Sequence, residues 1–305
     1  MKVCFVGVGS IGKRHIRNLR FIAKEDNISL EIHALRRKKG EADSFEKEYI
    51  DIVKYDFIEL DDKYDAIFVT NPTFLHYETI KRLKDKSKYF FVEKPVFDSC
   101  NIEYKDIIDE ENTYYVACPL RYTEIIKFAR KIVADNKVIN MRAICSSYLP
   151  EWRPESDYRK TYSAHKDEGG GVEIDLIHEW DYISYLFGQP LDVKKIGGKY
   201  SDLEIDSDDL AVYLAEYESM IVELHLDYFG RVSRRNFEIQ TNDALYFFDF
   251  ISGKIEKNGI VIEQFDEKAN DKYIKEIRFF LDIMNGKEQN TNTIEHAVDV
   301  MRISV

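Results

Sequence analysis

Residues 2–12 read Lys-Val-Cys-Phe-Val-Gly-Val-Gly-Ser-Ile-Gly, so three glycines directly follow a short apolar run. The glycines have the spacing G-x-G-x-x-G, and the pattern from Ile11 to Lys24 predicts that a helix follows them. In such a strand-loop-helix the glycines allow a tight turn, close approach of a pyrophosphate to the backbone, and close packing of helix on strand. The helix N-terminus attracts the phosphate charge. We therefore predict a dinucleotide site at Gly7, Gly9, Ser10, Ile11 and Gly12; the alternative is a glycine turn without a ligand.

The rest of the chain separates into two patterns near residue 120. Before it, expected strands at 2–6, 28–35, 65–70, 89–92 and 114–117 alternate with helices, which predicts a parallel, doubly wound sheet. After it, period-two alternation, as in 221–228, predicts a mostly antiparallel sheet, with helices at 122–136, at 172–187 and from about 271. We expect an α/β protein with a dinucleotide-binding Rossmann domain over 1–120. A second, α+β domain built on this mostly antiparallel sheet is expected over 121–305.

Composition and charge narrow the classes of partner. The net charge of −12 disfavours binding to nucleic acid and to anionic membranes. No apolar run approaches the roughly 20 residues of a membrane helix, and the strand expected at the N-terminus leaves no room for a signal peptide. The four cysteines have no metal or redox spacing, so we expect reduced thiols in a cytoplasmic protein without a metal site.

The end of the second expected strand bears on the choice of cofactor. A carboxylate that holds the ribose hydroxyls of NAD is expected at this point, but the sequence continues with Arg36 and Arg37. Arginine can hold a 2′-phosphate with two hydrogen bonds, which favours NADP over NAD, although NAD stays possible. The alternative is a solvated basic loop that continues through Lys38 and Lys39.

Three further motifs follow the glycine loop: Thr70-Asn71-Pro72 with His76, then Glu93-Lys94-Pro95, and then Gly169-Gly170-Gly171 with Asp175 and His178. In this order the motifs resemble the glucose–fructose oxidoreductase / inositol dehydrogenase / MocA (Gfo/Idh/MocA) family over nearly the whole chain. The resemblance implies an active site in a cleft between the two domains. It also implies that 121–305 is the substrate-binding and oligomerisation domain, with a large open sheet through which homodimers or homotetramers form. It also implies oxidation or reduction of a hydroxyl or keto carbon of a sugar or cyclitol. The cofactor contacts that it implies outside the glycine loop come from Thr70, Asn71, Pro72, His76, Glu93 and Lys94.

The chemistry of hydride transfer suggests roles for three residues. An alcohol carbon needs a group that takes or returns the hydroxyl proton and a positive group beside the oxygen. By the resemblance, Lys94 would contact nicotinamide and substrate, while Asp175 and His178, three residues apart on an expected helix, would face the substrate. Many family members separate the latter pair by four residues, so which of them transfers the proton stays open. The alternatives are a surface lysine and a helix whose polar side faces water.

The segment before that helix combines aromatic rings and guanidinium groups, which suits a sugar that carries a phosphate or a carboxylate. The expected substrate contacts are Arg121, Trp152, Arg153, Tyr158, Arg159 and Tyr162. The segment also resembles, more weakly, family members of bacterial surface-sugar and sialic-acid-like pathways; the alternative is a packing loop with surface arginines. Two rival functions are an NAD-dependent hydrolase or lyase that oxidises a sugar transiently, and a sensor that binds NAD(P) without catalysis.

Overall fold

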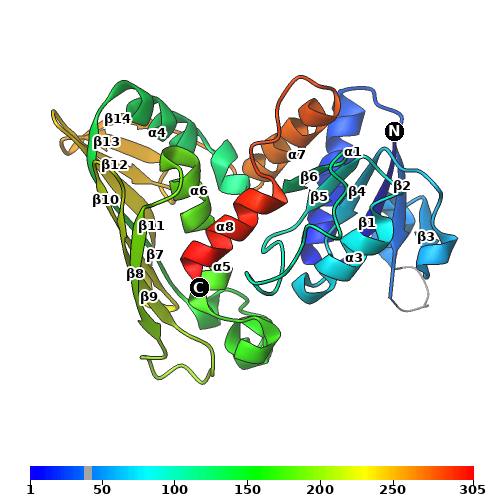
Figure 1. Cartoon of the computed structure of the whole chain (residues 1–305), viewed down its shortest axis with the longest axis horizontal. Coiled ribbons are helices and arrows are strands. Elements are labelled where there is room, and N and C mark those ends of the chain that lie inside the picture. The colour runs from blue at the N-terminus through cyan, green and yellow to red at the C-terminus, as the bar shows by residue number, and fades with distance from the viewer. Residues whose placement is uncertain (38–42) are drawn as a thin grey trace. The chain divides into compact units, whose positions relative to one another are not determined.

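The computed structural model describes residues 1–37 and 43–305, which form two compact units (Figure 1). The first comprises Met1–Pro119 and Asn270–Asp299, and the second comprises Leu120–Ala269 and Val300–Val305. The segment 270–299 thus groups with the first unit, although the expected second domain, 121–305, includes it. Lys38 and Lys39, which belong to the predicted basic loop, lie outside the described residues.

The first unit contains a six-stranded parallel sheet, which confirms the predicted doubly wound arrangement. Its strands lie in the order β3-β2-β1-β4-β5-β6, which is the Rossmann order. The strands are β1 (Lys2–Val6), β2 (Glu31–Leu35), β3 (Ile52–Lys54), β4 (Ala66–Val69), β5 (Tyr89–Val92) and β6 (Thr113–Val116). The helices are α1 (Ser10–Glu25), α2 (Ser44–Tyr49), α3 (His76–Leu83), α7 (Asp271–Met284) and most of α8 (Ile294–Ser304). The short elements β3 and α2 were not expected, because neither is long enough to give a periodic pattern.

Aromatic packing explains why α7 belongs with this sheet. The rings of Phe5 and Phe68, on adjacent strands, stack with centroids 4.4 Å apart, and Phe68 stacks on Phe91 at 5.0 Å. Phe280 of α7 meets the rings of Phe68 and Phe91 edge-on at 5.6 and 5.4 Å. All four rings are fully buried, so separating α7 from the sheet would expose a large apolar area.

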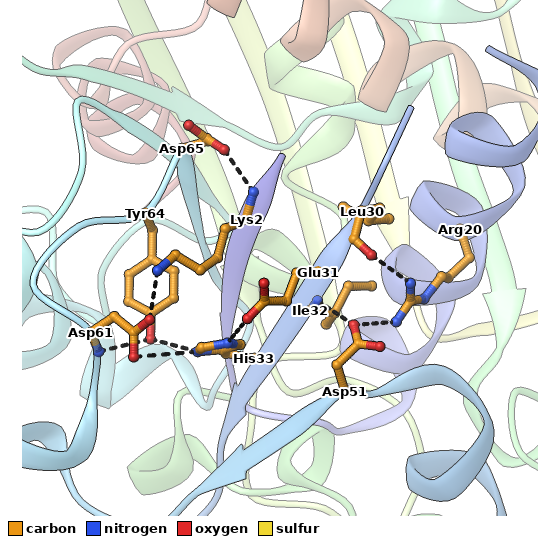
Figure 2. Close-up of polar contacts among 10 residues, drawn as sticks. All are labelled: Lys2, Arg20, Leu30, Glu31, Ile32, His33, Asp51, Asp61, Tyr64 and Asp65. Atoms are coloured by element: carbon orange, nitrogen blue, oxygen red, sulfur yellow. Dashed lines mark hydrogen bonds and ion pairs between the residues drawn. The ribbon is translucent and has the colours of Figure 1, made fainter. Parts of the chain in front are cut away.

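The amino-terminal edge of this sheet carries a polar network (Figure 2). Lys2 Nζ donates to Asp61 Oδ2 at 2.6 Å. The buried His33 lies between Glu31, whose Oε1 is 2.6 Å from its Nε2, and Tyr64, whose hydroxyl is 3.0 Å from its Nδ1. The glycine loop follows the opposite end of β1, so this network stabilises the sheet at the edge away from the loop.

The second unit is built on an eight-stranded sheet in the order β14-β13-β12-β11-β7-β10-β9-β8. Only the pair β7 and β10 is parallel among the described strand pairs of this sheet, so the prediction of a mostly antiparallel sheet is confirmed. Its strands are β7 (Val138–Tyr148), β8 (Asp192–Gly198), β9 (Leu210–Glu216), β10 (Ile221–Asp227), β11 (Phe229–Thr241), β12 (Leu245–Asp249), β13 (Lys254–Lys257) and β14 (Ile260–Gln264). Its helices are α4 (Glu124–Asp135), α5 (Val172–Asp175) and α6 (His178–Phe187).

The helix predicted over 172–187 is divided, which corrects the expectation of one continuous amphipathic helix. Between α5 and α6 some backbone hydrogen bonds span three residues instead of four: the amide of Ile177 donates to the carbonyl of Ile174, and the amide of Glu179 donates to the carbonyl of Leu176. Tyr182, which helical spacing places on the same side as Asp175 and His178, is also buried and packs on the ring of Phe237 at 5.4 Å. Within the described residues, no helix is long and apolar enough to cross a membrane.

Candidate functional site

The glycine loop has the backbone geometry that a dinucleotide requires. Gly7 has a φ of +99°, and a Cβ placed there would lie 2.6 Å from the amide nitrogen of Asn71. A Cβ on Gly12 would lie 2.5 Å from the carbonyl oxygen of Gly7. Gly9, the N-cap of α1, has no atom within 4 Å of the same position, so the loop is open at the point where a pyrophosphate would approach the backbone.

The first turn of α1 also suits an anion. Ser10 is exposed and Ile11 is half-buried, the N-cap has no side-chain hydrogen bond, and the turn contains no acidic residue. The amides at this helix end can therefore meet a phosphate without competition from a carboxylate of the same turn. These observations fit a dinucleotide at the predicted residues of the loop.

Residues that follow β4 form hydrogen bonds to the glycine loop and to the start of α3. Thr70 Oγ1 donates to the carbonyl of Gly7 at 2.6 Å, and Asn71 Nδ2 donates to Thr79 Oγ1 at 2.8 Å. Pro72 is exposed at the start of the next turn. His76 is completely buried, with its two ring nitrogens 2.9 Å from the Asn71 carbonyl and 3.1 Å from the Val96 carbonyl. Burial lowers the pKa of His76, and the neutral imidazole has one N–H, so it can donate to one of these two carbonyls at a time.

The Glu93-Lys94-Pro95 segment is held by a residue that the sequence did not indicate. His15 of α1 is fully buried, and its Nε2 lies 2.5 Å from Glu93 Oε1. The other oxygen of Glu93 accepts the backbone amide of Lys94 at 3.2 Å. The helix that begins at the glycine loop therefore fixes the carboxylate next to Lys94, whose own side chain is half-buried. His15 follows Gly12 by three residues, and this spacing along the buried side of α1 is the signal that could have identified it.

Arg36 and Arg37 follow β2, as predicted, and Arg37 is exposed. The Arg36 side chain is engaged by a carboxylate from α2: its Nη1 donates to Glu46 Oε2 at 2.8 Å. The sequence alone did not point to Glu46, because the short helix that carries it has no clear period.

In the second unit, Asp175 accepts hydrogen bonds from two tyrosines. The hydroxyls of Tyr162 and Tyr228 each lie 2.6 Å from one of its carboxylate oxygens. Burial and the Asp175 charge raise the pKa of both phenols, so the tyrosines stay protonated as donors. Tyr228 was not among the predicted residues, since it follows β10 with no motif of its own.

Other predicted substrate residues lie around this carboxylate. Trp152 meets the ring of Tyr228 edge-on at 5.3 Å and donates its Nε1 to Ser147 Oγ at 2.9 Å. The Arg153 guanidinium lies 5.7 Å from the ring centre of Tyr162, a residue that is 41% exposed. Contacts through Tyr162 and Tyr228 therefore link Trp152, Arg153 and Asp175, and His178 begins the following helix.

Three of the remaining predicted residues form ion pairs or hydrogen bonds with other residues of the second unit. The completely buried Arg121 pairs with Asp181, with N–O distances of 2.8 and 2.5 Å. Arg159 pairs with Asp157 at 2.9 Å and with Glu204 at 2.8 Å, and these carboxylates raise its pKa. The Tyr158 hydroxyl accepts the amide of Glu204 at 3.2 Å.

The triple glycine also serves the fold. A Cβ on Gly170 would lie 2.2 Å from the carbonyl oxygen of Tyr162 and 2.7 Å from that of His165, so the chain here passes close to its own backbone. Gly169 and Gly171 have positive φ values of 81° and 141°. The positive φ values favour glycine at positions 169 and 171, and the close backbone carbonyls favour it at position 170. Among the described residues, no cluster of three or more His, Cys, Asp or Glu side chains is arranged to hold a metal ion.

Comparison with known proteins adds a family and several relatives. Residues 1–116 match the model of an oxidoreductase family with an NAD-binding Rossmann fold, GFO_IDH_MocA. An uncharacterized oxidoreductase, YrbE, of Bacillus subtilis is 28% identical over 187 residues, which are 60% of this chain and 52% of the relative. The 2,7-anhydro-N-acetylneuraminate hydratase of Escherichia coli is 25% identical over 63% of this chain and 51% of its own length. The myo-inositol 2-dehydrogenase of Thermotoga maritima is 26% identical over 63% of this chain and 56% of its own.

The alignments to these relatives span about half of each relative's length. Among solved structures, the scyllo-inositol dehydrogenase of Lactobacillus casei, with bound NAD(H) and scyllo-inositol, superposes with a TM-score of 0.80. The superposition covers 100% of this chain and 94% of that one at 18% identity, a level at which the likeness concerns the fold.

Proposed function

Because the chain belongs to the Gfo/Idh/MocA oxidoreductase family, whose model matches residues 1–116, we propose that it is an NAD(P)-dependent dehydrogenase or reductase of a sugar-like CH–OH group. The observation that carries the proposal is the glycine loop, which is closed around Gly7 and Gly12 but open at Gly9. The relative named myo-inositol 2-dehydrogenase supports a polyhydroxylated substrate. A bound nicotinamide would supply the hydride donor or acceptor.

The proposed catalytic residues are Lys94, His178 and Asp175. Lys94 would stabilise the substrate oxygen, and its position next to Glu93, which His15 holds, supports a fixed backbone there. Both oxygens of Asp175 already accept tyrosine hydroxyls, which favours a role in holding Tyr162 rather than in proton transfer. We therefore assign the proton transfer to His178, whose imidazole has a suitable intrinsic pKa.

The proposed substrate is a sugar, cyclitol or related compound with an anionic group, and a nucleotide-linked surface sugar is one such compound. Tyr162 is partly exposed, and Trp152 packs on Tyr228, which shares Asp175 with Tyr162; such aromatic side chains suit the apolar face of a sugar ring. Arg121 and Arg159 are paired with carboxylates of this chain, so we assign the anionic group to Arg153. We propose NADP as the preferred cofactor, read by Arg36 and Arg37, with NAD also accepted.

We further propose a cytoplasmic homodimer or homotetramer that binds neither nucleic acid nor membranes. The four cysteines form no disulfide, in keeping with a reducing compartment. The strands of the second unit expose apolar side chains, among them Ile196, Leu214 and Ile221, and a second copy covering them would bury this surface. The net charge of −12 is unfavourable for polyanionic partners.

A substrate screen tests the proposed reaction. The purified chain is incubated with NADP⁺ or NAD⁺ and a panel of cyclitols, sugar acids and nucleotide sugars, and with the reduced cofactors and the corresponding ketones. We expect at least one compound to change the nicotinamide absorbance, and Lys94→Met to abolish that change. A chain that binds either cofactor but acts on no compound would instead be a sensor, which is a rival to this proposal.

A second candidate function is favoured by the relative named 2,7-anhydro-N-acetylneuraminate hydratase. A hydrolase or lyase could oxidise a sugar transiently, break a neighbouring bond and return the hydride, so that the cofactor is regenerated. Such an enzyme would convert an anhydro sugar acid without any net change in nicotinamide absorbance, which product analysis by mass spectrometry would detect.

A further inference from the structure

The end of β2 adjoins the glycine loop, so the residues that follow it lie beside the proposed dinucleotide site. The amide of Gly7 donates to the carbonyl of Leu35 at 3.3 Å, and Arg36 is the next residue. In a Rossmann sheet the adenosine ribose of the cofactor reaches this strand end, where the residue present distinguishes a 2′-hydroxyl from a 2′-phosphate. The contacts of Arg36 therefore bear on the relative affinities of the site for NADP and NAD.

The Arg36 guanidinium forms an ion pair with the buried carboxylate of Glu46. Its Nη1 donates to Glu46 Oε2 at 2.8 Å; the Glu46 side chain is 3% exposed and that of Arg36 is 28% exposed. The same oxygen of Glu46 accepts the backbone amide of Asp43 at 3.1 Å. The carboxylate is therefore fixed by α2 itself, and it orients the arginine while opposing part of its charge.

A second cation is paired in the same way. Asp43 caps α2 by accepting the amide of Glu46 at 2.8 Å, and its other oxygen accepts Lys13 Nζ at 2.7 Å. Lys13 belongs to the first turns of α1, so the capping box of α2 engages one cation from each neighbouring element of the loop. A 2′-phosphate that binds Arg36 must approach a site in which these charges are already balanced.

We propose that Glu46 is the specificity-determining residue for the choice between NADP and NAD. Its charge moderates the attraction of Arg36 for a 2′-phosphate, so the chain accepts both cofactors with a modest preference for NADP. The inference rests on the proposed function, because it assumes that the glycine loop holds a nicotinamide dinucleotide. Neither the glycine motif nor the arginines alone imply it, since both are compatible with a strict preference for NADP.

Glu46→Gln tests the proposal directly. Glutamine keeps an oxygen that accepts from Arg36 and from the Asp43 amide, but it removes the negative charge that lies 2.8 Å from the arginine proposed to hold the 2′-phosphate. For charges in a partly solvated site, we expect NADPH to bind about five-fold tighter, with NADH within about two-fold of wild type. Arg36→Gln should weaken NADPH by about ten-fold or more and leave NADH nearly unchanged.

Glu48→Gln is the matched control, because it removes the same charge from an exposed position of the same helix. It should leave the affinities for both cofactors within about two-fold of wild type at the same ionic strength. Binding is measured by titration of the full chain with NADPH and NADH, and thermal unfolding of each variant verifies that it is folded.

The outcomes separate the two levels of the proposal. Selective tightening of NADPH in Glu46→Gln supports it, whereas weaker NADPH binding, or equal changes for both cofactors, overturns the role of Glu46 alone. If the Glu46→Gln variant does not fold, the affinities of the wild type still test the inference. We expect the wild type to bind NADPH less than about ten-fold tighter than NADH, and a preference above about a hundred-fold overturns the inference. Failure of the wild type to bind either cofactor would overturn the proposed function as well.

Discussion

Adding one methyl group at two glycines of the same loop should have opposite consequences. Gly7 has a φ of +99°, and a Cβ there would lie 2.6 Å from the amide nitrogen and 2.7 Å from the Cα of Asn71. Gly9 has a φ of −74° and a ψ of −171°, which alanine adopts readily, and nothing lies within 4 Å of its Cβ position. Gly7→Ala should therefore damage the fold, whereas Gly9→Ala should damage binding only.

The magnitudes follow from these two environments. For Gly7→Ala, a left-handed backbone costs roughly 1–3 kcal/mol and overpacking against backbone atoms costs about as much again, so the free energy of unfolding should fall by about 2–6 kcal/mol. For Gly9→Ala, the change in stability should stay within about 0.5 kcal/mol. Its methyl group would occupy the space that a pyrophosphate needs, so the affinity for NADPH and NADH should fall by about ten-fold or more.

Thermal unfolding and cofactor titration measure the two effects on the same samples. The melting temperature of Gly7→Ala should fall by at least about 5 °C, and that of Gly9→Ala should match wild type within about 2 °C. The explanation of the loop would be refuted if Gly9→Ala bound the dinucleotides as tightly as wild type, or if it lost as much stability as Gly7→Ala.

Three further substitutions and one labelling experiment test other parts of the structure. Lys94→Met should abolish turnover with a substrate found by the screen while NADPH affinity stays within about three-fold of wild type, and retained turnover would remove Lys94 from the chemistry. Arg121→Met should lower the free energy of unfolding by about 3–5 kcal/mol, because it leaves the buried Asp181 carboxylate unpaired; chemical denaturation measures this, and an unchanged midpoint would contradict it. Burial raises the pKa of Asp209, but hydrogen bonds from Ser201, Tyr200 and Lys199 outweigh this effect, so the net pKa lies below 3.8. The ionised Asp209 therefore stabilises the fold above pH 3.8, and this stabilisation is lost as the pH falls through the folded pKa. Asp209→Asn should consequently melt lower than wild type near neutral pH, and the difference should shrink on acidification below 3.8; a constant difference would exclude this source of stability. Burial raises the pKa of the Cys4 and Cys145 thiols to about 12, so iodoacetamide should alkylate the more accessible Cys100 first in the folded protein, as mass spectrometry of the labelled peptides would show.

Local patterns were sufficient for much of the first unit. The glycine loop, β1 and α1 were predictable from consecutive residues, because turn chemistry and helical periodicity act within about one helix length. The grouping of α7 with the first sheet was not, since it depends on Phe280 packing against Phe68, a contact between residues far apart in the sequence.

The candidate sites show the same limit. Tyr162 and Asp175 were predicted because they lie in a recognisable segment, but Tyr228, which donates to the same carboxylate, is separated from it by 53 residues. Arg36 could be identified from its place after a strand, whereas its partner Glu46 belongs to a helix too short to predict from periodicity. The division between α5 and α6 was missed because Leu176, Trp180 and Ile183 continue a helical apolar spacing across it, so the hydrophobic pattern does not record the change in hydrogen bonding.

Isotope transfer tests the proposed hydride transfer most directly. A ketone that scores in the screen is incubated with the full chain and with NADPH deuterated at the transferable position of nicotinamide C4, and the products are examined by mass spectrometry. We predict that deuterium appears on the new carbinol carbon in an amount equal to the cofactor oxidised. Conversion of the compound with no deuterium gained and no cofactor consumed would contradict the proposed dehydrogenase.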